Sequence, residues 1–334
     1  MGVCCSSRKD ATSGSSNRKN LVAVSKKSRM ALEALDTRND ELERFVQATI
    51  AAGKPWTDPD FPPNSSSLVD PDVDGGDPGR FASYSWKRVP EIYEKPQIFE
   101  DGVEPNDINQ GSLGDCYFLA ALSSLAEFED RVKAMFVTKE INEAGIYLVR
   151  FFLNGIETNV VIDDHLPTRA NGSPAFATSR DGELWVSFLE KAWAKLHGTY
   201  ARTEGGLPSF AASHITGVPS ESHFHDSQEN VDEFWAMLQR ADRCGFTMMA
   251  ASHGQGEERS ADGVISGHAY SLISIYEFLH RGQEVRLLKL RNPWGRGEWA
   301  GAWSDGDEVW TPQLREELGC VEADDGVFFS ALEE

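Results

Sequence analysis

In the segment 116–128, hydrophobic residues are spaced so that they would cover every side of a helix and not only one face. The apolar positions are Tyr117, Phe118, Leu119, Ala120, Ala121, Leu122, Leu125, Ala126 and Phe128. A helix that is apolar all round is buried, so this pattern predicts a helix at the centre of a sizeable domain. Asp115 is a favourable N-cap residue for it, and Gly111 and Gly114 allow the preceding backbone to turn sharply.

The hydrophobic pattern changes at the two glycines 205–206. Before them, the sequence predicts two strands joined by an Asn154–Gly155 turn and an aromatic-rich helix, at residues 146–152, 158–162 and 183–200. After them, it predicts one helix and four strands, at residues 231–241, 246–252, 268–278, 284–292 and 325–332. We therefore expect an α+β fold with a helical first lobe (residues 56–206) and a β-sheet second lobe (residues 207–334).

The N-terminal part has a weaker pattern. A broken helical stripe of apolar residues at 30–50 predicts a short amphipathic helix, and Pro, Asp, Gly and Ser at 51–80 predict extended loop. Residues 30–55 would thus link the two lobes to residues 1–29, whose basic, low-complexity composition predicts a disordered tail.

The composition is that of a protein with a large core. Hydrophobic residues make up 40% of the 334 positions, and nine of these are Trp. Five cysteines are an odd, low number that gives no disulfide framework, which favours a reducing compartment. The sequence contains no run of 18 apolar residues and no secretory signal, so we expect no membrane-spanning helix.

The net charge of −21 is unevenly distributed. Residues 1–29 hold seven basic residues and one acidic residue (+6), whereas the rest hold 25 basic and 52 acidic residues (−27). An acidic body argues against a nucleic-acid partner and is compatible with cation binding or with a solvated surface. Two metal patterns are incomplete: segment 70–77 lacks the closing Glu of an EF-hand, and the pair His223 and His225 has no adjoining ligand cluster.

The first six residues, MGVCCS, fit a lipidation pattern. Gly2 with Ser6 four residues later matches N-myristoylation, and Cys4 and Cys5 are candidates for S-palmitoylation. One myristoyl chain binds membranes only marginally, so the two cysteines and the basic segment would supply the second signal for an anionic leaflet. We expect an intracellular protein at the cytoplasmic face of a membrane; the alternative is a disordered basic tail whose Gly2 is accidental.

Cys116 occupies the first turn of the predicted central helix. Unpaired N–H groups and the helix dipole favour negative charge there, and the thiolate is the nucleophilic form of cysteine. The competing interpretation is a small hydrophobic core residue, because free cysteines are often buried.

Two polar residues supply the partners that an active cysteine needs. His268 begins one predicted strand and Asn292 ends the next, so antiparallel pairing would let the Asn carbonyl orient the imidazole towards Cys116. The order Cys, His, Asn, with the first two 152 positions apart, resembles the separation of about 130–150 residues in one class of thiol proteases. Gln110 can donate to an oxyanion, and Trp294 could shield the His–Asn bond from water.

Three segments carry a more specific resemblance: QGSLGDCYFLAALSSL at 110–125, GHAYSLI at 267–273 and RNPWGRGEWAGAWSD at 291–305. They look like the active-site blocks of calpains, the papain-related intracellular cysteine proteases, and the likeness extends from about Trp56 to the last residues. It implies a papain-like two-lobed core with the active site in the cleft and limited cleavage of protein substrates. Its implied catalytic residues are Cys116 (nucleophile), His268 (base and acid), Asn292 (orienting residue) and Gln110 (oxyanion hole).

The calpain resemblance also implies two Ca²⁺ ions, one in each lobe. By motif position, the first would be held by Asp107, Glu190 and backbone carbonyls near Glu100 and Gly102. The second would be held by Glu298, Asp305 and Asp325.

The sequence departs from the calpain pattern in three places. Val327 stands where calpains usually have another acid, which should weaken the second Ca²⁺ site. Tyr117 replaces the usual Trp after the nucleophile. The chain also stops at the end of the protease core, without the C2-like and EF-hand domains, so we expect regulation through the core's own Ca²⁺ sites, the tail or partners.

Together these features predict an acylated, calcium-dependent cysteine endopeptidase acting at a membrane surface. One alternative is a catalytically silent membrane scaffold, against which the complete Gln, Cys, His and Asn set argues. Another is a transglutaminase, which usually has Asp where this chain has Asn292.

Overall fold

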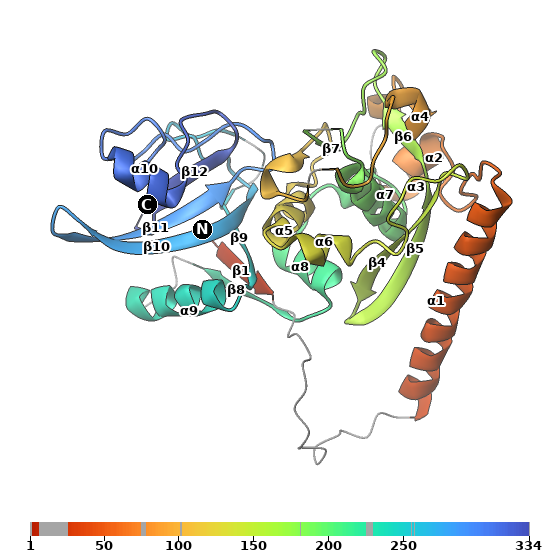
Figure 1. The fold of residues 1–334 in the computed structure, drawn as a ribbon, viewed down its shortest axis with the longest axis horizontal. Helices are drawn as coiled ribbons and strands as arrows, with labels where there is room; N and C mark the ends of the chain where they lie inside the picture. The colour runs from red at the N-terminus through yellow and green to blue at the C-terminus, as the bar shows by residue number, and fades with distance from the viewer. Residues whose placement is uncertain are drawn as a thin grey trace.

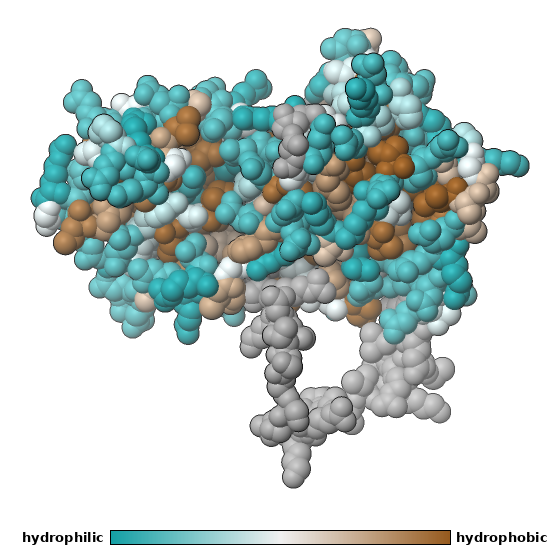
Figure 2. All heavy atoms as spheres, viewed as in Figure 1, coloured by the Kyte–Doolittle hydropathy of each residue, from teal (hydrophilic) through white to brown (hydrophobic). Residues whose placement is uncertain are grey.

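The computed structural model describes residues 2–6, 26–74, 78–100, 102–180, 182–224, 230–254, 256 and 258–333. Figure 1 shows two lobes side by side, one built mainly of helices and one on a β-sheet, with the long helix α1 along the outer edge of the helical lobe. Figure 2 shows this face largely hydrophilic, with hydrophobic residues gathered mainly over the helical lobe. Across the described residues, no helix combines the length and hydrophobicity needed to span a membrane.

The helix that begins at Cys116 forms the centre of the first lobe, as the sequence predicted. All eleven residues of α5 are buried. Phe118 of α5 stacks on Trp193 of α7, with ring centroids 4.6 Å apart and an interplanar angle of 9°. The elements of this core are α5 (Cys116–Ala126), α6 (Glu129–Lys133), α7 (Trp185–His197), α8 (Pro208–Thr216), β4 (Ile146–Leu153) and β5 (Ile156–Asp163). The predicted Asn154–Gly155 turn joins β4 to β5, with φ angles of 53° and 76°.

Short elements complete the first lobe and form small antiparallel pairs, β2 with β6 and β3 with β7. The strands are β2 (Ser85–Arg88), β3 (Ile108–Asn109), β6 (His165–Thr168) and β7 (Thr178–Ser179). The helices are α2 (Ser65–Leu68), α3 (Pro71–Asp74), α4 (Val89–Ile92), η1 (Pro78–Phe81), η2 (Pro105–Asp107) and η3 (Ala201–Thr203).

The second lobe is built on a six-stranded antiparallel sheet in the order β12-β11-β10-β9-β1-β8. The predicted helix and four strands of this lobe are confirmed, and α9 packs Phe234, Trp235 and Leu238 into the core on the sheet. The elements are β8 (Ser220–Phe224), α9 (Val231–Arg243), β9 (Thr247–Ala251), β10 (Ala269–His280), β11 (Gln283–Arg291), α10 (Pro312–Leu318) and β12 (Val327–Ala331).

The N-terminal segment differs from the sequence prediction. Gly2–Ser6, expected within a disordered tail, form strand β1 between β8 and β9, antiparallel to both. The physical reason is that β8 and β9 each offer a row of backbone donors and acceptors, which an extended five-residue segment can satisfy through its own backbone whatever its side chains. Residues 7–25 lie outside the described part of the chain.

The predicted amphipathic helix is longer than expected. It is α1 (Lys26–Ala52), which begins within the segment assigned to the disordered tail. Val46 is buried against Ala144, Ile146 and Leu148 on the outer face of the β4–β5 pair. This apolar stripe holds α1 on the first lobe.

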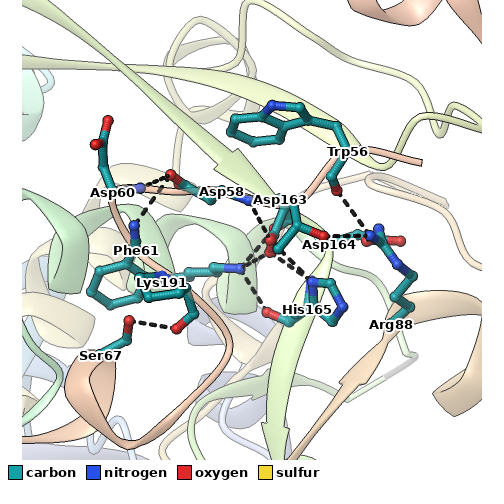
Figure 3. A network of polar contacts seen from close by, with 12 residues as sticks. Trp56, Asp58, Asp60, Phe61, Ser67, Arg88, Asp163, Asp164, His165 and Lys191 are labelled. Carbon is teal, nitrogen blue, oxygen red and sulfur yellow. Dashed lines mark hydrogen bonds and ion pairs between the residues drawn. The ribbon is translucent and has the colours of Figure 1, made fainter. Parts of the chain in front are cut away.

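A buried charged network fixes α7 against the strands beside it (Figure 3). Lys191 of α7 and Asp163 of β5 are fully buried and form an ion pair. The Lys191 ammonium also donates to the backbone oxygens of Asp163 (2.9 Å) and His165 (2.7 Å). Burial alone would raise the pKa of Asp163, but hydrogen bonding to His165 and the Lys191 charge hold that pKa well below its usual range.

Direct contacts join the two lobes around α5. Ser271 Oγ of β10 donates to Ala120 O (2.9 Å), and Ser124 Oγ donates to Met248 O of β9 (2.5 Å). Helix α8 follows the predicted boundary at residue 206, yet it packs against α5 in the first core. The boundary itself stays a prediction.

Candidate active site

Cys116 is the first residue of α5 and is 7% exposed. The Asp115 backbone oxygen accepts hydrogen bonds from Phe118 N (2.9 Å) and Leu119 N (3.2 Å), which starts the helix directly after it. Asp115 holds the N-cap position as predicted, but within the described residues its side chain makes no capping hydrogen bond to the helix. The unpaired N–H groups and the dipole at the start of α5 are thus what favours negative charge at Cys116.

The Asp115 side chain is instead buried beside Glu190 of α7. The two residues are 0% and 2% exposed, and Glu190 accepts from Ala177 N at 3.0 and 3.1 Å. Burial raises the pKa of Glu190 well above its usual value, and the neighbouring Asp115 raises it further. The raised pKa favours the neutral form of Glu190, which limits the negative charge buried beside Asp115.

His268 and Asn292 meet as the sequence predicted. Their contact joins His268 Nε2 to Asn292 Oδ1 at 2.9 Å, and both residues are almost fully buried. Because a carbonyl oxygen only accepts, Nε2 donates the proton and Nδ1 carries the lone pair of the neutral ring. Asn292 Nδ2 donates to Gly297 O at 2.9 Å, which fixes which end of the amide faces the histidine.

Trp294 lies against this pair. Its ring centroid is 4.9 Å from that of His268, and its backbone N–H donates to Asn292 Oδ1 at 3.0 Å. Ser252 Oγ accepts from His268 N at 3.1 Å, which holds the backbone of the histidine. These contacts keep the imidazole in one orientation.

Gln110 connects the lobes and lines a cavity of about 600 Å³. Its backbone N–H donates to Pro293 O at 2.9 Å, next to Asn292. Its side-chain Nε2 donates to Leu113 O at 2.6 Å, which uses one of the two amide hydrogens. The cavity lies between residues 109–114 and 294–296, the two segments that flank the predicted chemistry.

The cysteine and histidine halves of the site lie on elements that pack together. Cys116 and Ala269, the neighbour of His268, belong to one buried hydrophobic cluster. Strand β10 packs along α5. The helix that begins at Cys116 and the strand that follows His268 are thus packed on each other, as a Cys–His pair requires.

Arg291 is a site neighbour that the sequence interpretation missed. It is fully buried, and its guanidinium donates across the lobes to Asn106 O (3.2 Å) and Ile108 O (2.6 Å). Burial lowers its pKa to about 10. The available signal was an arginine at the end of an apolar strand, directly before Asn292.

The residues predicted to bind the first Ca²⁺ do not share one set of contacts. Asp107 Oδ2 accepts from Glu104 N at 2.8 Å, whereas Glu190 contacts Ala177 and Asp115. Near Glu100 the structure places the carboxylate of Glu183, which accepts from Glu100 N and from Trp185 Nε1 (3.0 Å). Sequence spacing alone does not show which of the two acids, Glu183 or Glu190, lies near Glu100.

The residues predicted to bind the second Ca²⁺ lie close together. Glu298 Oε1 accepts from Asp325 N and Gly326 N, both at 2.8 Å. Burial and the neighbouring Asp305 and Asp325 raise the pKa of Glu298 to about 7, and burial with Asp325 raises that of Asp305 to about 6. Val327 N donates to Asp325 Oδ1 at 2.9 Å.

Neither predicted Ca²⁺ site is formed by the side chains that the structure describes. In the part of the chain that the structure describes, no group of three or more His, Cys, Asp or Glu side chains is arranged to hold a metal ion. The Ca²⁺ roles of Gly102, Asp107, Glu190, Glu298, Asp305 and Asp325 therefore stay predictions. The lipidation candidates Gly2, Cys4 and Cys5 lie on β1, where the structure describes only the backbone.

Comparison with known proteins places these residues in context. The model of the family described as calpain family cysteine protease matches residues 56–334. The chain is 37% identical over 321 residues to the calpain-type cysteine protease DEK1 of Arabidopsis thaliana, covering 90% of this chain and 15% of that protein. It is 35% identical over 303 residues to calpain-8 of Rattus norvegicus, covering 87% and 42%. The chain thus spans less than half the length of these relatives.

Proposed function

The chain belongs to the calpain family of cysteine proteases, and we propose that it is an endopeptidase that uses Cys116 as its nucleophile. The observation that carries this proposal is the 2.9 Å contact between His268 Nε2 and Asn292 Oδ1. It leaves Nδ1 as the basic nitrogen of a histidine whose strand packs on the helix that begins at Cys116.

The reaction proposed for these residues has two steps. His268 takes the proton of the Cys116 thiol, and the thiolate attacks the carbonyl carbon of the scissile peptide bond. As the tetrahedral intermediate collapses to a thioester, the C–N bond breaks and His268 gives its proton to the departing amine. A water molecule, deprotonated by His268, then attacks the thioester and releases the second product with the thiol restored.

The oxyanion of each tetrahedral intermediate needs hydrogen-bond donors. The second amide hydrogen of Gln110 and the backbone N–H of Cys116 at the start of α5 are the donors proposed here. The contact between Gln110 N and Pro293 O supports this role, because it fixes Gln110 relative to the strand end that carries Asn292.

Calcium dependence is proposed for the second lobe. Glu298, Asp305 and Asp325 have the oxygen donors that Ca²⁺ prefers, and burial together with the neighbouring carboxylates raises the pKa of the first two. A bound Ca²⁺ would supply charge neutralisation next to the 291–298 segment, and so help to hold Asn292 and Trp294 in place.

Attachment to a cytosolic membrane leaflet through Gly2, Cys4 and Cys5 is a further part of the proposal. Its support is the MGVCCS pattern with the basic residues that follow it. A Gly2→Ala variant should move from the membrane to the soluble fraction of expressing cells; retention in the membrane fraction would contradict the myristoyl assignment.

Proteolysis is tested directly with the purified full-length chain and casein as an unfolded protein substrate. The native chain should produce peptides that mass spectrometry can identify, whereas Cys116→Ser and His268→Ala should produce almost none. Intact casein with the native chain, both with and without Ca²⁺, would favour the alternative of a silent membrane scaffold.

A further inference from the structure

The 600 Å³ cavity beside Gln110 contains charged side chains that the proposed reaction does not use. Its lining includes Arg80, Glu204 and Arg296 together with the segments 109–114 and 294–295. Two positive charges in one cleft are unexpected in a chain whose net charge is −21. Their surroundings indicate which of them is available to a substrate.

Arg80 is already paired. Its Nη1 lies 2.5 Å from Glu204 Oε2, and its Nη2 donates to Ser112 O at 3.2 Å. Glu204 Oε1 also accepts from Gly114 N at 3.2 Å. Arg80 and Glu204 thus neutralise each other and brace the 112–114 wall of the cavity.

Arg296 has no such partner. It is exposed, and among the described residues its side chain forms neither an ion pair nor a hydrogen bond. The turn that carries it is held firmly: a Cβ on Gly295 would lie 2.3 Å from Asn109 Oδ1, so this turn packs tightly on the opposite wall. Among the residues that line the cavity, Arg296 therefore carries the positive charge that is not paired with a lining carboxylate, and it does so from a firmly held backbone.

Trp294 links the cavity to the residue that protonates the departing amine in the proposed reaction. His268 protonates that amine in the proposed reaction, and Trp294, which lines the cavity, is 4.9 Å from the His268 ring between centroids. A substrate residue just after the scissile bond would therefore lie against Trp294, two positions before Arg296.

From this arrangement we propose that Arg296 selects substrates with an acidic residue immediately after the scissile bond. The inference rests on the proposed protease function and adds a substrate class to it. The carboxylate of such a residue would accept charge-assisted hydrogen bonds from the guanidinium of Arg296. Because Arg296 is exposed, the preference should be modest, about three- to tenfold in kcat/KM.

The test uses three peptides based on one casein sequence that the native chain cuts, with Glu, Gln or Lys directly after the scissile bond. The native chain should prefer Glu to Gln and Gln to Lys, and the preference should shrink as KCl is raised. Arg296→Gln should bring the Glu-to-Gln ratio of kcat/KM close to one, and Arg296→Glu should make Lys the preferred residue.

Arg281→Gln, at the exposed turn between β10 and β11, is the matched control for loss of one positive charge. It should keep the native Glu-to-Gln ratio. An unchanged ratio in Arg296→Gln, or equal cleavage of all three peptides by the native chain, would overturn the inference while leaving the protease function intact. Failure of the native chain to cut any peptide or casein would contradict the protease function itself.

Discussion

Asn292 orients His268 through two hydrogen bonds of its own side-chain amide, one at the oxygen and one at the nitrogen. Oδ1 accepts from His268 Nε2, and Nδ2 donates to Gly297 O, so the amide cannot rotate without losing both hydrogen bonds. The neutral tautomer of His268 with its lone pair on Nδ1 is therefore favoured before any substrate binds.

Replacing Asn292 by Ala should lower kcat by roughly 10²-fold, because His268 would lose its fixed tautomer and orientation. Peptide hydrolysis measured from pH 5 to 9 should also show an altered pH profile, which a purely structural loss would not produce. Asn171→Ala, in an exposed turn, is the control and should retain native kcat. An unaltered kcat in Asn292→Ala would contradict the orienting role.

At the scale of residues, the sequence was informative where order and spacing decide the outcome. The succession of Cys116, His268 and Asn292 predicted a contact that the structure contains between the last two. For the first lobe's Ca²⁺ site the same approach predicted Glu190, and that role stays a prediction; the structure shows Glu183 in contact with Glu100. Which carboxylate reaches a loop depends on helix rotation and loop path, and the sequence pattern specifies neither.

The helix α7 illustrates how one buried charge fixes an element. The Lys191 side chain has no exposed area. Its ammonium therefore relies on hydrogen bonds to Asp163 and His165 in place of water. The depressed pKa of Asp163 means that this carboxylate stabilises the fold at pH values above its unfolded pKa, about 4. That contribution is lost as the pH falls towards the folded pKa.

Lys191→Met should destabilise the protein by about 3–5 kcal/mol, because it leaves the Asp163 carboxylate buried without its counter-charge. Urea unfolding followed by tryptophan fluorescence measures the change. Adding Asp163→Asn to Lys191→Met should recover part of the loss, and the exposed Lys139→Met is the control. A Lys191→Met protein as stable as the native one would contradict the role of the ion pair.

Among the elements, those with a strong hydrophobic period were predicted and those with polar sequences were not. The all-round apolar pattern of α5 and the alternation in β9, β10, β11 and β12 matched the structure because burial enforces both. Strand β1 was missed because its pairing depends on the exposed edges of β8 and β9, which its own residues do not encode. The charged Arg291 between the lobes was also missed, because its partners Asn106 and Ile108 lie far from it in the sequence.

Over the whole molecule, the relation of the two lobes determines whether the site is complete. Gln110 N contacts Pro293 O, and Arg291 contacts Asn106 and Ile108, so the walls of the cleft are joined close to the reacting groups. The acidic cluster of the second lobe, Glu298, Asp305 and Asp325, lies along the same 291–298 segment. A change in the charge of this cluster can therefore alter how the two lobes align.

The stability of the second lobe should depend on pH and Ca²⁺ together. The pKa values of Glu298 (about 7) and Asp305 (about 6) lie above their usual values, so the folded state binds protons more tightly than the unfolded state. Their contribution is therefore fully present below the unfolded pKa values, near 4, and is lost as the pH rises through 6 to 7.

Added Ca²⁺ should raise the Tm more at pH 8 than at pH 5, since it would compete with protons for the same carboxylates. Differential scanning calorimetry measures the shift. Glu298→Gln should reduce it, and Glu316→Gln, an exposed acid on α10, should not. An equal Tm shift at both pH values, or none, would contradict Ca²⁺ binding at this cluster.

The most direct test of the central claim is labelling of the purified full-length chain by an epoxide-type cysteine-protease probe, with Ca²⁺ titrated from chelator to millimolar concentrations. We predict that one probe molecule binds per chain at Cys116, that labelling increases with Ca²⁺, and that Cys116→Ala abolishes it. Absence of labelling at every Ca²⁺ concentration, or equal labelling of Cys116→Ala, would contradict the proposal that this chain is a cysteine protease acting through Cys116.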